Sequence, residues 1–110
     1  MSDWQVYYTD KARNDLSDVY EYIAYTLLVP DTAKSQMERI MCAIDELGHL
    51  PFRHELYNDD PWRSRGLRQM PVDHYLVFYL PIEAHRLVAI VRIMYGGSDT
   101  KSRLLNTPTV

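Results

Sequence analysis

The fold is decided by residues 74–95, which read HYLVFYLPIEAHRLVAIVRIMY. Aromatic and β-branched residues dominate this stretch, and they predict strands over 74–80 and 86–95. Pro81–His85 interrupts the pattern and fits a turn, so the two strands are expected to pair as neighbours. Residues 88–94 are almost entirely apolar. This predicts that the second strand is central in its sheet and covered by helices on at least one face.

Further strands are predicted on the N-terminal side of this stretch. Residues 65–72 have strand character and are joined to the next strand by a turn at Val72–His74, so three consecutive strands should form a meander. Trp4–Tyr8, near the start of the chain, is short, aromatic and β-branched, which predicts one more strand. Between 50 and 65 the pattern lapses into a loop rich in proline, asparagine and aspartate.

Two amphipathic helices are predicted between the first strand and this loop. Apolar residues recur at spacings of three and four in two stripes: Ala12, Leu16, Val19, Tyr20, Ile23 and Leu27, then Ala33, Met37, Ile40, Met41, Ile44 and Leu47. Thr9 or Asp10 can cap the first helix, and Pro30 with Asp31 separates the two. Cys42 falls on the second stripe and is predicted to be a small core residue. The two helices should form an antiparallel hairpin.

The predicted element order is β-α-α-β-β-β. It indicates an α+β fold, with the helical hairpin packed on one face of an antiparallel sheet. The chain has 110 residues, 46% of them hydrophobic and 25% charged, which is typical of one globular domain spanning 1–110. Whether residues 98–110 are ordered or form a flexible tail is left open. Neither a signal-peptide pattern nor a long apolar run is found, so we expect a cytoplasmic protein with no membrane partner.

Charge is distributed unevenly along the chain. Residues 1–60 hold 5 basic and 12 acidic residues, a net of −7, whereas residues 61–110 hold 7 basic and 3 acidic ones, a net of +4. The arginines therefore gather on the predicted strands and around them. Clustered arginines can hold an anionic partner even when the net charge is −3. They can equally protect exposed sheet edges from aggregation, and the sequence does not decide between the two.

Several of these segments together resemble the RelE/ParE superfamily of toxins from bacterial type II toxin–antitoxin systems. The segments are Gly66–Arg68, Tyr75–Tyr79, Val91–Gly96 and the opening Tyr8–Leu16 with its later Tyr22–Ile23. The resemblance covers about residues 4–100. It implies the α+β fold described above and a cognate antitoxin, encoded next to the toxin, as partner. It also implies one of two activities: mRNA cleavage on the ribosome, as in RelE-like members, or poisoning of DNA gyrase, as in ParE-like members.

The resemblance assigns candidate catalytic roles to Arg68 and Tyr95. Arg68 matches the arginine of a Leu-Arg motif that helps to stabilise phosphate in the nucleolytic members, a task that a planar guanidinium suits. Tyr95 stands where many relatives have histidine, and its phenol could act as a general acid or as a stacking platform. Ser98 stands where the pattern has arginine, which removes a cation from a nuclease site. A structural alternative for Arg68 is an ion pair with Asp15 or Asp18 on the first helix.

Other residues are assigned supporting roles. The candidates for substrate binding are Arg63, Arg65, Lys101 and Arg103. Arg92 could supply charge as well, although in a central strand it could equally be paired and structural. The weaker ionisable candidates are Glu46, His49, His54 and His74, none with the spacing of a metal site. No metal and no cofactor are expected, because transesterification at a ribose 2′-OH needs neither.

Three functional hypotheses follow from the sequence and the resemblance. A toxin that inhibits translation by ribosome-associated mRNA cleavage is placed slightly ahead. A ParE-type gyrase poison without nuclease activity is the alternative, favoured by Ser98 and by the acidic net charge. The third is a degenerate member that binds antitoxin without being toxic.

Overall fold

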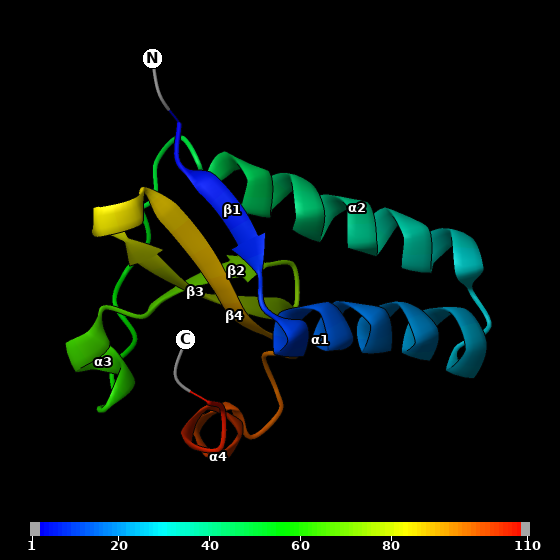
Figure 1. Cartoon of the computed structure of the whole chain (residues 1–110). Coiled ribbons are helices and arrows are strands. Elements are labelled where there is room, and N and C mark those ends of the chain that lie inside the picture. The colour runs from blue at the N-terminus through cyan, green and yellow to red at the C-terminus, as the bar shows by residue number, and fades with distance from the viewer. Residues whose placement is uncertain (1–2, 109–110) are drawn as a thin grey trace.

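A computed structural model describes residues 3–108 of the chain. In chain order its elements are β1 (Gln5–Tyr8), α1 (Asp10–Glu21), the π-helical turn η1 (Tyr22–Thr26), α2 (Pro30–Glu46), α3 (Trp62–Arg65), β2 (Arg68–Val72), β3 (Tyr75–Ile82), the 3-10 turn η2 (Glu83–His85), β4 (Leu87–Tyr95) and α4 (Thr100–Leu105). The strands form one sheet in the order β1-β4-β3-β2 (Figure 1). The predicted α+β class is confirmed, and β4 is central as expected.

One pairing differs from the prediction of a wholly antiparallel sheet. β2–β3 and β3–β4 are antiparallel, but β1 lies parallel to β4, with Gln5 opposite Leu87 and Tyr8 opposite Ile90. The meander from β2 to β4 occupies one side of β4, so β1 takes the edge of β4 that remains. The parallel direction is allowed because the helices and the meander provide the long connection that parallel strands need. The sheet is therefore mixed.

The helical hairpin packs on one face of this sheet, as predicted. Its buried side chains join those of the strands in one apolar cluster: Ala12, Leu16, Val19, Ile23, Ala24, Ala33, Ile40, Ile44, Leu47, Met70, Val77, Tyr79, Val88, Ile90 and Ile93. The Thr9 hydroxyl caps α1 by accepting a hydrogen bond from the Ala12 N–H at 3.2 Å. The prediction for Cys42 is wrong, because its side chain is exposed. Ile40 and Ile44 point to the core, and Cys42, two residues after Ile40, lies well around the helix from both.

The opposite face of the sheet is covered by α3, α4 and the loop before β2. The buried side chains of this second cluster are Tyr57, Trp62, Leu67, Phe78, Leu80, Val91, Met94 and Leu104. Trp62 Nε1 donates a hydrogen bond to the Leu104 carbonyl at 2.8 Å, which fastens α3 to α4. Within the segment whose order the sequence left open, Thr100–Leu105 is thus a docked helix. Residues 109–110 lie outside the described part of the chain.

The start of β2 also differs from the predicted strand over 65–72. Arg65 ends α3, and Gly66 follows in the left-handed conformation (φ +95°), which glycine adopts without strain. Arg63 and Arg65, expected on a loop and at a strand start, therefore lie on a short helix. Among residues 3–108, no helix combines the length and the apolar character needed to cross a membrane.

Candidate functional site

Arg68 begins β2 and is engaged by the backbone of the preceding loop. Its Nη1 donates hydrogen bonds to the carbonyls of Phe52, at 3.3 Å, and His54. The guanidinium also lies 5.2 Å from the centre of the Phe52 ring, a cation–π contact. Neither Asp15 nor Asp18 pairs with it, so the structural alternative named the wrong partners. In this conformation Arg68 fastens the loop to the sheet.

The two catalytic candidates, Arg68 and Tyr95, are not brought together. Arg68 is opposite Tyr79 on β3, whereas Tyr95 is opposite Tyr75. The four residue steps from Tyr75 to Tyr79 span about 13 Å along the strand. In addition, β3 lies between β2 and β4. One phosphate group cannot contact both side chains in this arrangement.

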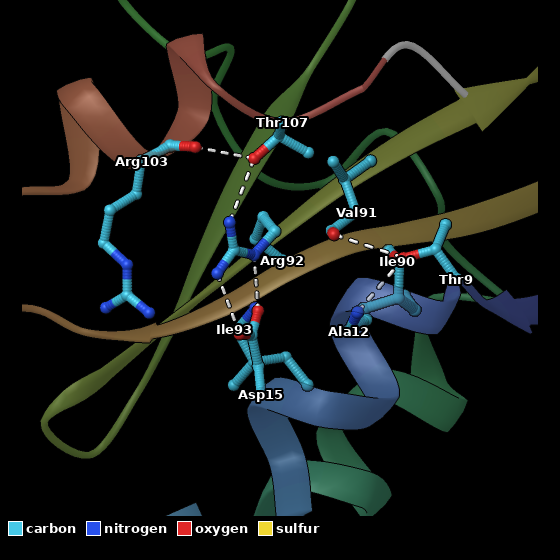
Figure 2. Close-up of polar contacts among 9 residues, drawn as sticks. All are labelled: Thr9, Ala12, Asp15, Ile90, Val91, Arg92, Ile93, Arg103 and Thr107. Carbon is cyan, nitrogen blue, oxygen red and sulfur yellow. Dashed lines mark hydrogen bonds and ion pairs between the residues drawn. The ribbon is translucent and has the colours of Figure 1, made fainter. Parts of the chain in front are cut away.

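Arg92 forms a buried ion pair with Asp15 of α1 (Figure 2). Arg92 Nε lies 2.7 Å from one carboxylate oxygen and Nη2 lies 2.9 Å from the other, a bidentate contact. The third nitrogen, Nη1, donates to the Thr107 hydroxyl at 3.0 Å, and this hydroxyl donates to the Arg103 carbonyl at 2.7 Å. The hydrogen bonds to Asp15 raise the pKa of Arg92 above its ordinary value. Arg92 thus has a structural role, which is one of the two roles that the sequence analysis left open.

The Asp15 pair lies where β1 stops covering the edge of β4. β1 ends at Tyr8, so the backbone of β4 beyond Ile90 needs other partners. Thr9 Oγ1 donates to the carbonyls of Ile90, at 2.8 Å, and Val91, at 3.2 Å. Asp15 Oδ2 accepts from the Ile93 N–H at 2.9 Å. Two side chains therefore continue the hydrogen bonding that a longer strand would provide.

Tyr95 and Arg103 do share one site, an open groove of about 640 Å³. The groove lies between α1 with η1 on one side and the end of β4 with α4 on the other; among its lining residues are Asp18, Tyr22, His74, Tyr75, Tyr95 and Arg103. The Tyr75 and Tyr95 rings meet edge to face with their centres 5.9 Å apart. Burial raises the pKa of Tyr75, and the nearby Tyr95 and Tyr22 hydroxyls add to the effect. A Cβ on Gly97 would lie 2.7 Å from the Tyr95 ring, so glycine is needed there for this ring position.

The remaining substrate-binding candidates lie away from this groove. Arg65 stacks on the Trp62 ring at 5.1 Å, and Arg63 Nη1 donates to the Tyr57 carbonyl at 3.5 Å. Lys101 lines a cleft of about 10 Å³ beside Asp59, Asp60 and other side chains. The predicted site residues are thus divided among the start of β2, the α3–α4 side and the groove. Because each position depends on long-range packing, local sequence spacing could not have shown this division.

The weaker candidates in and after the last turn of α2, which are Glu46, His49 and His54, lie outside the groove. His49 Nδ1 lies 3.1 Å from Asp3, and Glu46 lies 3.9 Å from Arg53. Burial, followed by the Arg53 charge, lowers the pKa of His54. His74 is the exception, since it lines the groove beside Tyr75. Within residues 3–108, no group of three or more His, Cys, Asp or Glu side chains could hold a metal ion.

Comparison with known families gives a match to the ParE toxin of the type II toxin–antitoxin system parDE over residues 6–100. The matched region includes most of β1, the helical hairpin, the meander and the groove-lining Tyr95. No curated protein sequence matches the chain.

Solved structures of toxin–antitoxin systems share the fold. The chromosomal ParDE system from P. aeruginosa contains a chain that superposes with a TM-score of 0.68 at 18% identity, covering 84% of this chain and 95% of that one. The toxin–antitoxin complex RelBE2 from Mycobacterium tuberculosis gives a TM-score of 0.61 at 20% identity, covering 86% and 93%. At these identities the likeness establishes the fold alone.

Proposed function

Because the chain belongs to the family of ParE toxins of type II toxin–antitoxin systems, we propose that it arrests bacterial growth and that a cognate antitoxin neutralises it. We further propose that the toxin acts by binding a protein target, DNA gyrase, rather than by cutting mRNA. Gyrase is the target that the resemblance to ParE-like members implies. Both candidate targets lie in the bacterial cytoplasm, where we expect the chain to act.

This proposal rests on the contacts that the arginines already make within the protein. Cleaving RNA at a 2′-OH requires a base, an acid and a cation on the phosphate at one point. Arg68 bonds two loop carbonyls, and Arg92 is buried against Asp15. Ser98, whose hydroxyl bonds the Tyr95 carbonyl at 2.6 Å, offers no charge where the nucleolytic members have arginine. A cleavage centre around Arg68 and Tyr95 therefore lacks a cation that is free to hold the phosphate.

mRNA cleavage remains the second candidate because one observation favours it. The groove contains an imidazole, a phenol and a guanidinium, those of His74, Tyr95 and Arg103. In such a reaction His74 would take the 2′-OH proton as O2′ bonds to phosphorus. Tyr95 would protonate the leaving 5′-oxygen as its bond to phosphorus breaks, and Arg103 would hold the phosphate.

Pulse-labelling after induction of the chain in bacteria separates the two mechanisms. Protein and DNA synthesis are followed side by side, together with the variant His74→Gln and the double variant Tyr95→Phe/Arg103→Ala. We expect DNA synthesis to fall before protein synthesis, with the unchanged chain and with either variant that still arrests growth. An immediate fall in protein synthesis that both variants abolish would contradict gyrase as the target and favour cleavage. Unimpaired growth on induction would contradict a toxin altogether.

A further inference from the structure

The tip of the helical hairpin exposes a group of large apolar side chains that are close together in the sequence. Five large apolar residues of its eight-residue stretch 22–29 are between 42% and 76% exposed: Tyr22, Tyr25, Leu27, Leu28 and Val29. We call them the tip patch. The tip extends away from the sheet, as Figure 1 shows at the turn between α1 and α2. Single exposed apolar residues are ordinary, but a contiguous group of this kind marks an interaction surface.

The backbone of the tip patch is not arranged for maximal stability. α1 passes into the π-helical turn η1 at Tyr22, a rare geometry that is common at functional sites. Leu28 has φ +59° and is also the most exposed member of the patch. A leucine in the left-handed region costs about 1–2 kcal/mol that glycine would not. Local folding therefore gives no reason for an exposed leucine here, whereas contact with a partner does.

The tip patch continues into the groove described above. Tyr22, Leu27 and Val29 belong to both, while Tyr75 and Tyr95 form the facing wall. A partner seated here would therefore lie on an exposed apolar rim and place side chains between two walls. This is the shape that receives the apolar face of a helix, with anchors at helical spacing.

The charges near the groove and the tip patch indicate the sign of the charge that the partner carries. Asp18 lines the groove, Glu21 directly precedes the tip patch at the end of α1, and Asp31 follows the patch in the first turn of α2. None of the three makes an ion pair or side-chain hydrogen bond with residues 3–108, whereas Asp15 is paired with Arg92. Among the described residues that line the groove, Arg103 is the one lysine or arginine, and its guanidinium makes no ion pair within residues 3–108. Three unpaired carboxylates repel nucleic acid and favour lysine or arginine.

We propose that the groove and the tip patch dock the toxin's protein target through an apolar helical segment flanked by lysine or arginine. This inference rests on the proposed function, because it names the surface and the chemistry by which a protein target is held. The apolar side chains would fill the groove between Tyr22 and Tyr95, and the basic ones would meet Asp18, Glu21 and Asp31.

Two synthetic peptides test the docking chemistry on the purified chain. Each is an amphipathic helix of about 18 residues, long enough to cover some 27 Å. Both have leucine on one face; one has lysine and the other glutamate on the opposite face. In fluorescence anisotropy we expect the lysine peptide to bind at least about tenfold more tightly, a difference of about 1.4 kcal/mol. Asp18→Asn with Glu21→Gln should remove most of that preference.

Leu27→Asp should weaken the lysine peptide about tenfold. Leu50→Asp is the matched control, because Leu50 is also about half exposed but lies outside the tip patch and the groove. Equal binding of the two peptides would overturn the proposal, as would competition by a single-stranded RNA oligonucleotide. So would a dimer of the chain, seen in sedimentation, that Leu27→Asp converts to monomer.

Growth arrest in cells shows whether the groove and the tip patch are occupied by the target or by the antitoxin. Induced without antitoxin, Leu27→Asp should lose the arrest while Leu50→Asp keeps it, with circular dichroism confirming that both are folded. Full arrest by Leu27→Asp would assign the surface to another partner and overturn the proposal. If the unchanged chain causes no arrest, the proposed function fails, and the peptide measurement still decides whether the groove docks a basic apolar segment.

Discussion

At the scale of single residues, Asp15 links α1 to the central strand β4. It accepts two hydrogen bonds from Arg92 and one from the Ile93 N–H, and both members of the pair are more than nine-tenths buried. An ion pair of this kind adds little when compared with apolar packing. Removing one partner, however, leaves a buried charge without compensation.

Arg92→Ala should therefore lower the free energy of unfolding by about 3–5 kcal/mol in urea denaturation. Arg39→Ala is the control, since the 2.8 Å pair of Arg39 with Asp73 is exposed and worth about 0–1 kcal/mol. Similar losses in the two variants would show that Asp15 finds water or another donor once Arg92 is gone.

Tyr8 provides a prediction on alkaline stability. Its hydroxyl is buried without a hydrogen-bond partner among residues 3–108, and burial, with a contribution from Asp45, raises the pKa of Tyr8 from 10.0 to about 12. Above pH 10.0 the unfolded chain loses this proton while the folded chain keeps it, so stability falls as the pH rises from 10.0 towards 12.

Tyr8→Phe should leave stability at neutral pH unchanged or slightly higher, because it removes an unpaired buried hydroxyl. Its free energy of unfolding should also decline less steeply above pH 10.0 than that of the unchanged chain. Parallel slopes in the two proteins would mean that the Tyr8 hydroxyl ionises in the folded state as easily as in water.

At the scale of elements, the turn between η1 and α2 combines backbone strain with exposed apolar surface. Leu28→Gly should raise the free energy of unfolding by about 1 kcal/mol, because glycine tolerates φ +59°. Leu27→Gly is the matched control: Leu27 has φ −87°, so glycine there only adds freedom to the unfolded chain and should destabilise. Thermal unfolding of both variants checks the sign, and a loss with Leu28→Gly would mean that its side chain packs in the free protein.

At the scale of the whole molecule, the sheet joins two apolar clusters that neither set of helices could bury alone. β3 and β4 contribute to both, with Val77 and Ile93 facing the hairpin and Phe78 and Val91 facing α3 and α4. If the elements on one face unfolded, the apolar side chains of β3 and β4 on that face would be exposed. The sheet on which the elements of the other face pack would then be weakened. The two sides should therefore unfold in one cooperative transition.

Urea unfolding of a Trp4→Phe background tests this expectation. Trp62 fluorescence then reports the α3–α4 side and far-UV circular dichroism reports mainly the hairpin. Adding Leu104→Ala, which empties a fully packed position on the α4 side, should cost about 2–4 kcal/mol and shift both signals together. An earlier Trp62 transition would show that α4 separates independently.

The sequence by itself determined the four strands, the helical hairpin and the family, but not the short helices α3 and α4. Strand and helix patterns are local, so the periodic stripes of α1 and α2 and the aromatic runs of β3 and β4 are visible without neighbours. Their order supported the α+β class and the resemblance to RelE/ParE toxins, both of which the structure and the family match confirm. The limits of the elements were less accurate: β2 begins at Arg68 because Gly66 ends α3 in a left-handed conformation.

Only the tertiary structure decided what the charged side chains do. Arg68 and Arg92 look alike in sequence as strand arginines, yet one bonds loop carbonyls and the other is paired with a carboxylate 77 positions away. The parallel β1–β4 pair, the exposed Cys42 and the groove shared by Tyr95 and Arg103 likewise depend on which segments meet in space. The hydrogen bonds and the burial of a side chain depend on the residues around it, and for these residues the neighbours come from distant parts of the chain.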